Sequence, residues 1–286
     1  MTASIASFLP AGLAFIMFAL GLKLSIDDFR RVLSQPVAVG LGLLAQVVLL
    51  PLTALGLIAA FDLSPEASVG LMILAACPGG VSAAMITNLS RGDTCLSITL
   101  TAFTSALSFI TVPIIVGFSL AHFLGQSTGV DYPVGQGMGG LFLITLLPVA
   151  AGLLLSHKGW VSNSASSLLG RVATAVFALI VISTFVTQWS SIVENFPLLG
   201  PAILLLNLLT MTTGAVIGCV GRLPADGRIA LAVECGIQNS ALGITIAVSM
   251  LGMAQLAVPS VVYAFLMNVT AVLLIAARQL RRPAAA

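Results

Sequence analysis

Nine long hydrophobic segments, separated by short connections, run along the whole chain. A helix needs about 20 mostly apolar residues to cross the hydrocarbon core of a bilayer. The sequence is 59% hydrophobic and 7% charged, which excludes an ordinary soluble domain. We therefore predict an all-α polytopic membrane protein with nine transmembrane helices and no separate soluble domain. The expected spans are approximately 7–25, 36–60, 67–89, 94–121, 135–156, 170–188, 198–220, 227–250 and 256–277.

The charges at the ends of these spans predict the orientation of the chain. Short cytoplasmic loops are enriched in Lys and Arg. If the N-terminus lies outside, all 11 Lys and Arg fall on the inner side, and the outer connections hold only acids. We expect a multi-pass protein of the cell inner (plasma) membrane, with the N-terminus outside and the C-terminus in the cytoplasm. The inner cations are Lys23, Arg30, Arg31, Arg91, Lys158, Arg171, Arg222, Arg228, Arg278, Arg281 and Arg282, and the outer acids are Asp62, Glu66, Asp131 and Glu194.

Glu234 is the one charged residue deep inside a predicted span. A carboxylate at that depth is expensive, so it usually faces the protein interior and has a partner. The residues that follow, Cys235-Gly236-Ile237-Gln238-Asn239, combine a helix-weakening glycine with two amide side chains. This combination indicates a cation site. A structural hydrogen bond to a neighbouring helix is the alternative.

Two of the predicted spans contain residues that interrupt a helix. The third carries Cys77-Pro78-Gly79-Gly80 at its middle, and the eighth carries Gly236. Proline removes a backbone donor, and glycine lets the backbone bend. Non-helical backbone at membrane depth survives where protein covers it or where it lines a wet cavity. Paired interruptions in two halves are typical of the binding site of a secondary transporter, although either one alone could be a packing kink.

The two interrupted spans are five helices apart. An odd offset reverses the orientation of a span, so we predict inverted repeats. The second repeat would hold spans five to nine, and the first only four. Relative to a five-plus-five plan, one N-terminal helix is missing, so the chain either lacks it or starts further upstream.

Oxygen-bearing groups in these spans could bind a sodium ion as the coupling ion. Unwound backbone carbonyls at broken helices are typical ligands. Ser97 and Thr101 share one face of a helix, where they either add oxygens or bond only to their own helix. The remaining candidates are Gln46, Glu234 and Gln238, with the carbonyls near Cys235 and Ile237.

An organic anion would be favoured at the N-termini of half-helices that start near Gly80 and Gln238. Ser82, Asn239 and Asn268 stand where they could donate hydrogen bonds to it. Because no Lys or Arg lies deep in a span, we expect the helix ends to bind the anion.

The sequence argues against enzymatic activity. No nucleophile with its base and no pair of acids lies within the spans, as an intramembrane hydrolase would need. The cysteines form no CxxC pair, and the two histidines occupy separate loops, so no transition metal or other cofactor is expected. The only partners that we expect are the lipid bilayer and a small-molecule substrate, with neither nucleic acid nor a protein partner. The residues concerned are Cys77, Cys95, Cys219, Cys235, His122 and His157.

Several motifs of this chain resemble the bile acid:sodium symporter family. They are Cys77-Pro78-Gly79-Gly80, Arg91-Gly92-Asp93 and Glu234-x-Gly236-x-Gln238-Asn239-Ser240, and the similarity covers nearly the whole chain in the same order. The short loops suit a bacterial homologue. The resemblance implies one transmembrane transporter domain, 1–286, with a three-helix panel and a six-helix core. Panel helices would lie in 1–33 and 134–190, and core helices in 34–121 and 196–280, with two crossing breaks near 77–80 and 234–238.

The resemblance also implies roles for individual residues. One sodium site would use Gln46, Glu234 and Gln238 with the two carbonyls. A second would use Ser97, Thr101 and Glu234 together with a Ser-Asn pair, which Ala83 and Ala84 replace here. We therefore expect one strong sodium site and one that is weak or absent.

The expected function is sodium-coupled symport of organic anions, either small carboxylates or bile-acid-like compounds, by alternating access. The alternatives are a proton-coupled carrier in which Glu234 titrates, an uncoupled permease, or a membrane protein that transports nothing.

Overall fold

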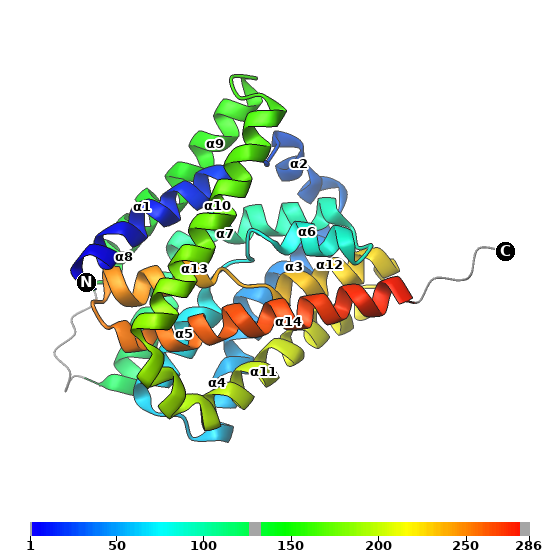
Figure 1. The fold of residues 1–286 in the computed structure, drawn as a ribbon. Coiled ribbons are helices and arrows are strands. Elements are labelled where there is room, and N and C mark those ends of the chain that lie inside the picture. Colours follow the sequence, from blue (N-terminus) through cyan, green and yellow to red (C-terminus); the bar gives the residue numbers. More distant parts are fainter. Residues whose placement is uncertain (1, 126–132, 281–286) are drawn as a thin grey trace.

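A computed structural model shows the chain folded into helices (Figure 1). It describes residues 2–125 and 133–280, apart from the side chains of 2–7 and 31–33. No strand occurs in these two ranges, so the predicted all-α class is confirmed. Among the residues used to predict the orientation, Asp131, Arg281, Arg282 and the side chain of Arg31 lie outside the described residues.

Six helical segments of the described chain are long and apolar enough to cross a membrane, and each corresponds to a predicted span. Three shorter apolar helices, Phe8–Gly21, Pro65–Ala76 and Ser240–Met250, overlap the other predicted spans. A polytopic membrane protein is therefore what the helices indicate. The six long segments are Pro36–Phe61, Thr94–Leu124, Val134–His157, Asn163–Thr187, Trp189–Val220 and Ala254–Leu280.

The elements follow one another with few residues between them. Some of the long helices contain a π-helical turn, and a 3-10 turn opens the last one. In chain order they are α1 (Thr2–Gly21), α2 (Ile26–Ser34), α3 (Pro36–Leu44), η1 (Ala45–Leu49), α4 (Leu50–Phe61), α5 (Pro65–Ala76), α6 (Ala83–Leu89), α7 (Thr94–Ser119), η2 (Leu120–Leu124), α8 (Val134–Leu141), η4 (Phe142–Leu146), α9 (Leu147–His157), α10 (Asn163–Thr187), α11 (Trp189–Val220), α12 (Ala225–Gly236), α13 (Ser240–Thr245), η5 (Ile246–Met250), η6 (Ala254–Ala257) and α14 (Val258–Leu280).

Two of the π-helical turns have a proline as their physical cause. Pro51 has no backbone N–H, and its ring would clash with the carbonyl four residues earlier. The helix widens before it, and the Leu50 N–H donates to the Ala45 carbonyl five residues back. The same arrangement precedes Pro148 in η4. π-Turns of this kind often occur at functional sites, and η1 carries Gln46.

The first predicted span ends earlier than the sequence suggested. We expected a helix over 7–25, but α1 stops at Gly21 and the amphipathic α2 begins at Ile26. The physical reason is a reciprocal cap between Ser25 and Asp28: the Ser25 N–H donates to Asp28 Oδ2 (2.7 Å), and the Asp28 N–H donates to Ser25 Oγ (3.3 Å). Such a capping box starts a new helix.

Close packing at glycines joins α1 to α9. A Cβ at Gly152 would lie 2.8 Å from the Leu22 nitrogen and 3.0 Å from the Gly21 carbonyl carbon, so a larger residue cannot occupy this position. α1 also packs against α10, and the three helices lie together at the upper left of Figure 1. Elsewhere α11 packs along α12 and α14, and α5 packs against α4 and α7.

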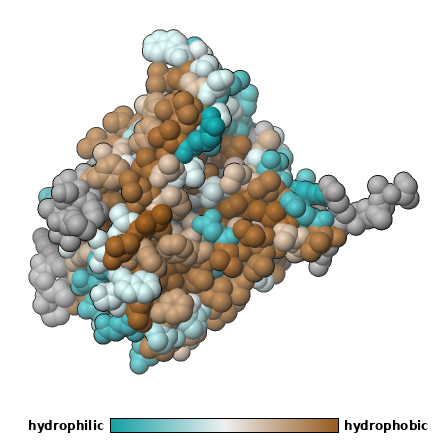
Figure 2. Space-filling model, viewed as in Figure 1, coloured by the Kyte–Doolittle hydropathy of each residue, from teal (hydrophilic) through white to brown (hydrophobic). Residues whose placement is uncertain are grey.

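The flanks of the helices carry exposed apolar side chains, as lipid contact requires. Leu179, Ile182, Val269 and Leu273 are each more than half exposed. On the face shown in Figure 2, hydrophobic residues cover most of the helix flanks, and hydrophilic ones gather mainly toward the ends of the molecule. This distribution is the reverse of that of a soluble protein.

Candidate ion and substrate site

Two interrupted helices meet at the centre of the site. α5 ends at Ala76 before α6 begins at Ala83, and α12 ends at Gly236 before α13 begins at Ser240. The two connections pass each other in antiparallel directions. The Gly80 N–H donates to the Ile237 carbonyl (2.7 Å), and the Asn239 N–H donates to the Pro78 carbonyl (2.9 Å). Each break therefore satisfies backbone groups that the other leaves without a helical partner.

Glu234 lies in the last turn of α12, and its side chain is fully buried. Thr101 Oγ1 lies 2.9 Å and 3.0 Å from the two carboxylate oxygens, and the Ser97 hydroxyl donates to Oε1. Among the described side chains, Glu234 forms no ion pair. Hydrogen bonds from neutral side chains, rather than a cationic partner, therefore hold this carboxylate.

Gly79 is glycine because Glu234 occupies the space beside it. A Cβ at position 79 would collide with Glu234 Oε2 and would lie 3.4 Å from both Gln46 Nε2 and Thr101 Oγ1. The backbone at Gly79 has no positive φ. Contact with the carboxylate, rather than backbone conformation, therefore excludes a larger residue.

Two buried amide side chains complete the surroundings of Glu234. Gln46 Nε2 donates to the Glu234 carbonyl (2.6 Å), and Gln238 Nε2 donates to the Cys235 carbonyl (2.9 Å). The oxygens Gln46 Oε1 and Gln238 Oε1 are buried without a hydrogen-bond partner. A buried acceptor without a donor is unfavourable by about 1–3 kcal/mol, and a cation is one means of satisfying it.

The end of α12 has two further partners that sequence reasoning missed. Asn207 Nδ2 (2.7 Å) and the Tyr263 hydroxyl (2.9 Å) both donate to the Gly236 carbonyl, and both side chains are fully buried. They cap the interrupted helix. The signal was available, because Asn207 is the one amide in the predicted span 198–220 and Tyr263 is one of two tyrosines.

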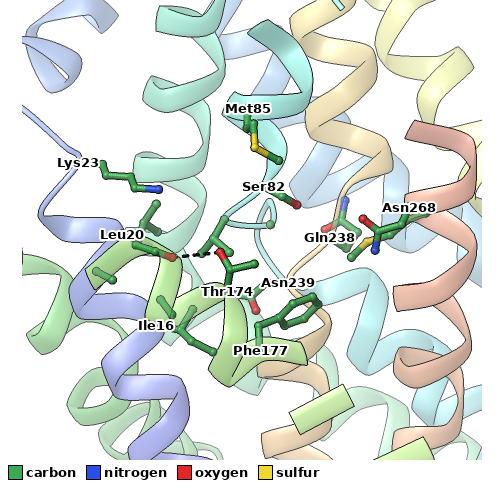
Figure 3. Close-up of a pocket in the computed structure, with 16 residues that line it drawn as sticks. Ile16, Leu20, Lys23, Ser82, Met85, Thr174, Phe177, Gln238, Asn239 and Asn268 are labelled. Carbon is green, nitrogen blue, oxygen red and sulfur yellow. Dashed lines mark hydrogen bonds between the residues drawn. The ribbon is translucent and has the colours of Figure 1, made fainter. Parts of the chain in front are cut away.

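A cavity of about 190 Å³ lies on the other side of the breaks, between α1, α6, α10 and α14 (Figure 3). Ser82, Asn239 and Asn268, the predicted substrate residues, all line it. Asn239 Oδ1 caps α13 through the Leu242 N–H (3.1 Å), and its Nδ2 is buried without a partner. Asn268 Nδ2 donates to the Ala264 carbonyl of its own helix (2.6 Å).

The structure therefore divides the predicted residues into two groups. Glu234 is surrounded by Gln46, Ser97, Thr101 and Gln238 together with the carbonyls near it, whereas Ser82, Asn239 and Asn268 face the cavity. Gln238 borders both groups.

The structure adds a further group to those expected to bind an anion. The half-helices begin at Ala83 and Ser240, later than expected, and α6 and α13 have only 7 and 6 residues. Lys23, which the sequence placed at the end of a span, lines the cavity as well. Helix ends are therefore not the only groups available to bind an anion.

A family model describing the Sodium Bile acid symporter family matches residues 10–195. The chain belongs to this family. An uncharacterized sodium-dependent transporter of Bacillus subtilis is 30% identical over 276 residues, which are 93% of this chain and 81% of that protein. The resemblance drawn from the motifs is thus confirmed.

Two mammalian transporters are also similar. A sodium-dependent organic anion transporter of Bos taurus is 30% identical over 220 residues, which are 72% of this chain and 57% of that protein. The human ileal sodium/bile acid cotransporter is 26% identical over 239 residues, which are 82% of this chain and 67% of that protein. These relatives are named as transporters rather than as enzymes.

Proposed function

We propose that the protein is a sodium-coupled symporter of small organic anions that works by alternating access. The observation that carries this proposal is the buried Glu234 carboxylate beside the unpartnered amide oxygens of Gln46 and Gln238. The three side chains together bring one negative charge and two neutral oxygens to one place. This set of groups suits a monovalent cation that prefers oxygen ligands.

The amide groups suggest how the ion would enter its site. Gln46 and Gln238 turn their nitrogens toward backbone carbonyls of Glu234 and Cys235. A half-turn of each carboxamide exchanges its nitrogen for its oxygen. A sodium ion can then lie between these oxygens, the carboxylate and the carbonyls near Cys235 and Ile237, in place of the two N–H donors.

We further propose one sodium ion per transport cycle rather than two. The hydroxyls of Ser97 and Thr101 donate their hydrogen bonds to the Glu234 carboxylate. Ala83 and Ala84, where the family pattern has a Ser-Asn pair, offer no side-chain oxygen. Ser97 and Thr101 would then contribute to sodium binding mainly by holding Glu234 in position.

The size of the cavity favours a small carboxylate over a bile acid. Pockets for drug-sized ligands occupy roughly 300–1,000 Å³, and this cavity is about 190 Å³. Ser82, Asn239 and Asn268 would supply the hydrogen-bond donors.

The connection between α12 and α13 offers a simple coupling element. Gln238 belongs to the ion site, and the next residue, Asn239, lines the cavity. Sodium binding at Gln238 would order this short connection and so fix the Asn239 amide against the substrate.

The packing of the helices supports a panel and a core within a nine-span architecture. α1 contacts α9 and α10, the helices assigned to the panel, whereas both broken helices contact α7 of the assigned core. The cavity lies where the two groups meet, and Lys23 at its rim belongs to the predicted cytoplasmic side. The panel would move against the core, with the N-terminus outside the plasma membrane and the C-terminus inside.

Uptake of radiolabelled pyruvate into proteoliposomes tests the proposed function. We expect an inward sodium gradient to drive accumulation and a potassium gradient to drive none. Glu234→Gln should abolish the accumulation, whereas Glu194→Gln, which changes an exposed carboxylate outside the site, should not. Accumulation driven by a proton gradient without sodium would support the proton-coupled alternative, and equilibration without any gradient would support the permease.

A further inference from the structure

Lys23 extends from the end of α1 over the cavity, with its nitrogen toward the interior (Figure 3). Its stem lies across Gly170 of α10, where a Cβ would come within 2.9 Å of Lys23 Cε and 3.0 Å of Nζ. The glycine thus leaves room for the lysine. Within the described part of the chain, the ammonium group has neither an ion-pair nor a hydrogen-bond partner.

The other polar groups that line the cavity, like Lys23, favour an anion. No Asp or Glu lines the cavity. Asn239 lines the cavity, the residue is only 4% exposed, and its buried Nδ2 has no hydrogen-bond partner. One positive charge, an unsatisfied buried donor and no acid make the cavity suitable for an anion rather than for a cation or an apolar molecule.

We propose that Lys23 binds the carboxylate of the transported anion in this cavity. The inference rests on the proposed function and adds a specificity-determining residue to it. Lys23 stands on the α1 side of the cavity, and Asn239 stands at the break on the opposite side. The substrate that satisfies both is a short carboxylate with a second oxygen acceptor, that is, a keto or hydroxy acid. Its two ends would join the α1 side to the broken helices.

The charge of the cavity can be measured without knowledge of the substrate. Ser82 lines the cavity, so Ser82→Cys in the purified full chain serves as a reporter, with modification at this position followed by mass spectrometry. It is treated with an anionic methanethiosulfonate reagent, the 2-sulfonatoethyl compound, and with a cationic one, the 2-trimethylammonioethyl compound. The ratio of the two rates reports the local potential. The comparison is repeated with Thr174→Cys, a second lining position.

We expect Lys23→Met, which keeps an unbranched stem beside Gly170, to lower the anionic-to-cationic rate ratio by about tenfold, as expected for one charge at close range. Lys23→Arg should restore the ratio. Lys158→Met, which removes an exposed lysine that does not line the cavity, should leave it unchanged. An unchanged ratio in Lys23→Met, or no access of either reagent to either cysteine, would overturn the proposal.

Sodium binding by the same variants keeps this inference separate from the proposed function. Lys23 is not among the groups around Glu234, so Lys23→Met should bind sodium with wild-type affinity. Loss of sodium binding in Lys23→Met would contradict the proposal that Lys23 acts only on the bound anion. Absence of sodium binding in the wild type would refute the coupling and leave the rate ratios to decide the role of Lys23.

Discussion

Gly79→Ala is the smallest change that should disable the proposed ion site. The new methyl group would collide with Glu234 Oε2, with Gln46 Nε2 and Thr101 Oγ1 each 3.4 Å away. Because these neighbours are buried side chains in mutual contact, the carboxylate must rotate away. It would then lose the hydrogen bond from the Thr101 hydroxyl, whose oxygen lies 2.9 Å and 3.0 Å from the two carboxylate oxygens.

The expected magnitude follows from that bond. A hydrogen bond to a charged group contributes about 1.5–3 kcal/mol, which corresponds to a roughly 10- to 140-fold change in a dissociation constant. Equilibrium binding of radioactive sodium to purified protein would measure it, and thermal unfolding would show that the variant is folded. We expect the sodium dissociation constant to rise by at least about tenfold.

Gly56→Ala is the matched control, because a Cβ at Gly56 meets no atom within 4 Å. Alanine is the better helix former, so this variant should be at least as stable as the wild type. If Gly79→Ala were folded and bound sodium with wild-type affinity, the contact between Gly79 and the carboxylate could not be what shapes the site.

Three further predictions concern other contacts between the helices. Thr101→Val keeps the shape of the side chain and removes the hydroxyl that contacts both oxygens of the Glu234 carboxylate. The sodium affinity of this variant should fall roughly tenfold, and its binding isotherm should stay non-cooperative. A change in cooperativity would mean that this hydroxyl binds a second ion. Asn207→Leu and Tyr263→Phe should each lower the melting temperature. The double variant should lose about 1 kcal/mol more free energy of unfolding than the sum of the two single losses, since each partner still caps α12 when the other is removed. Strict additivity in a double-mutant cycle would argue against a shared cap. Gly152→Leu should prevent folding, whereas Gly139→Leu, where a Cβ meets no atom within 4 Å, should be tolerated; size-exclusion chromatography of both variants provides the comparison, and a monodisperse Gly152→Leu peak would contradict the proposed packing.

The sequence identified the residues whose chemistry is unusual for their surroundings. Glu234 stood out because a charge deep in an apolar span is expensive, and Gln46 because it is the one amide in its span. Pro78 and Gly236 pointed to the places where the helices end, because their effect on helices is local. Such signals do not depend on the arrangement of the helices in space.

Relationships between helices could not be predicted in the same way. The sequence placed Asn207 and Tyr263 in two spans but did not indicate that both reach one carbonyl of α12. The sequence placed Lys23 at the cytoplasmic end of a span. The packing of α1 against α10, which brings this residue over the cavity, could not be predicted from the sequence. The end of α1 was also missed, because the Ser25–Asp28 cap was read as part of a continuous span.

Radioactive sodium binding to the purified wild type and to Glu234→Ala tests the central claim most directly. We predict saturable, non-cooperative binding of one ion per chain by the wild type and none by Glu234→Ala. A steep isotherm would mean that a second ion binds despite Ala83 and Ala84. A wild type that binds no sodium, or a Glu234→Ala variant that binds it as well as the wild type, would contradict the assignment of this carboxylate as the sodium site.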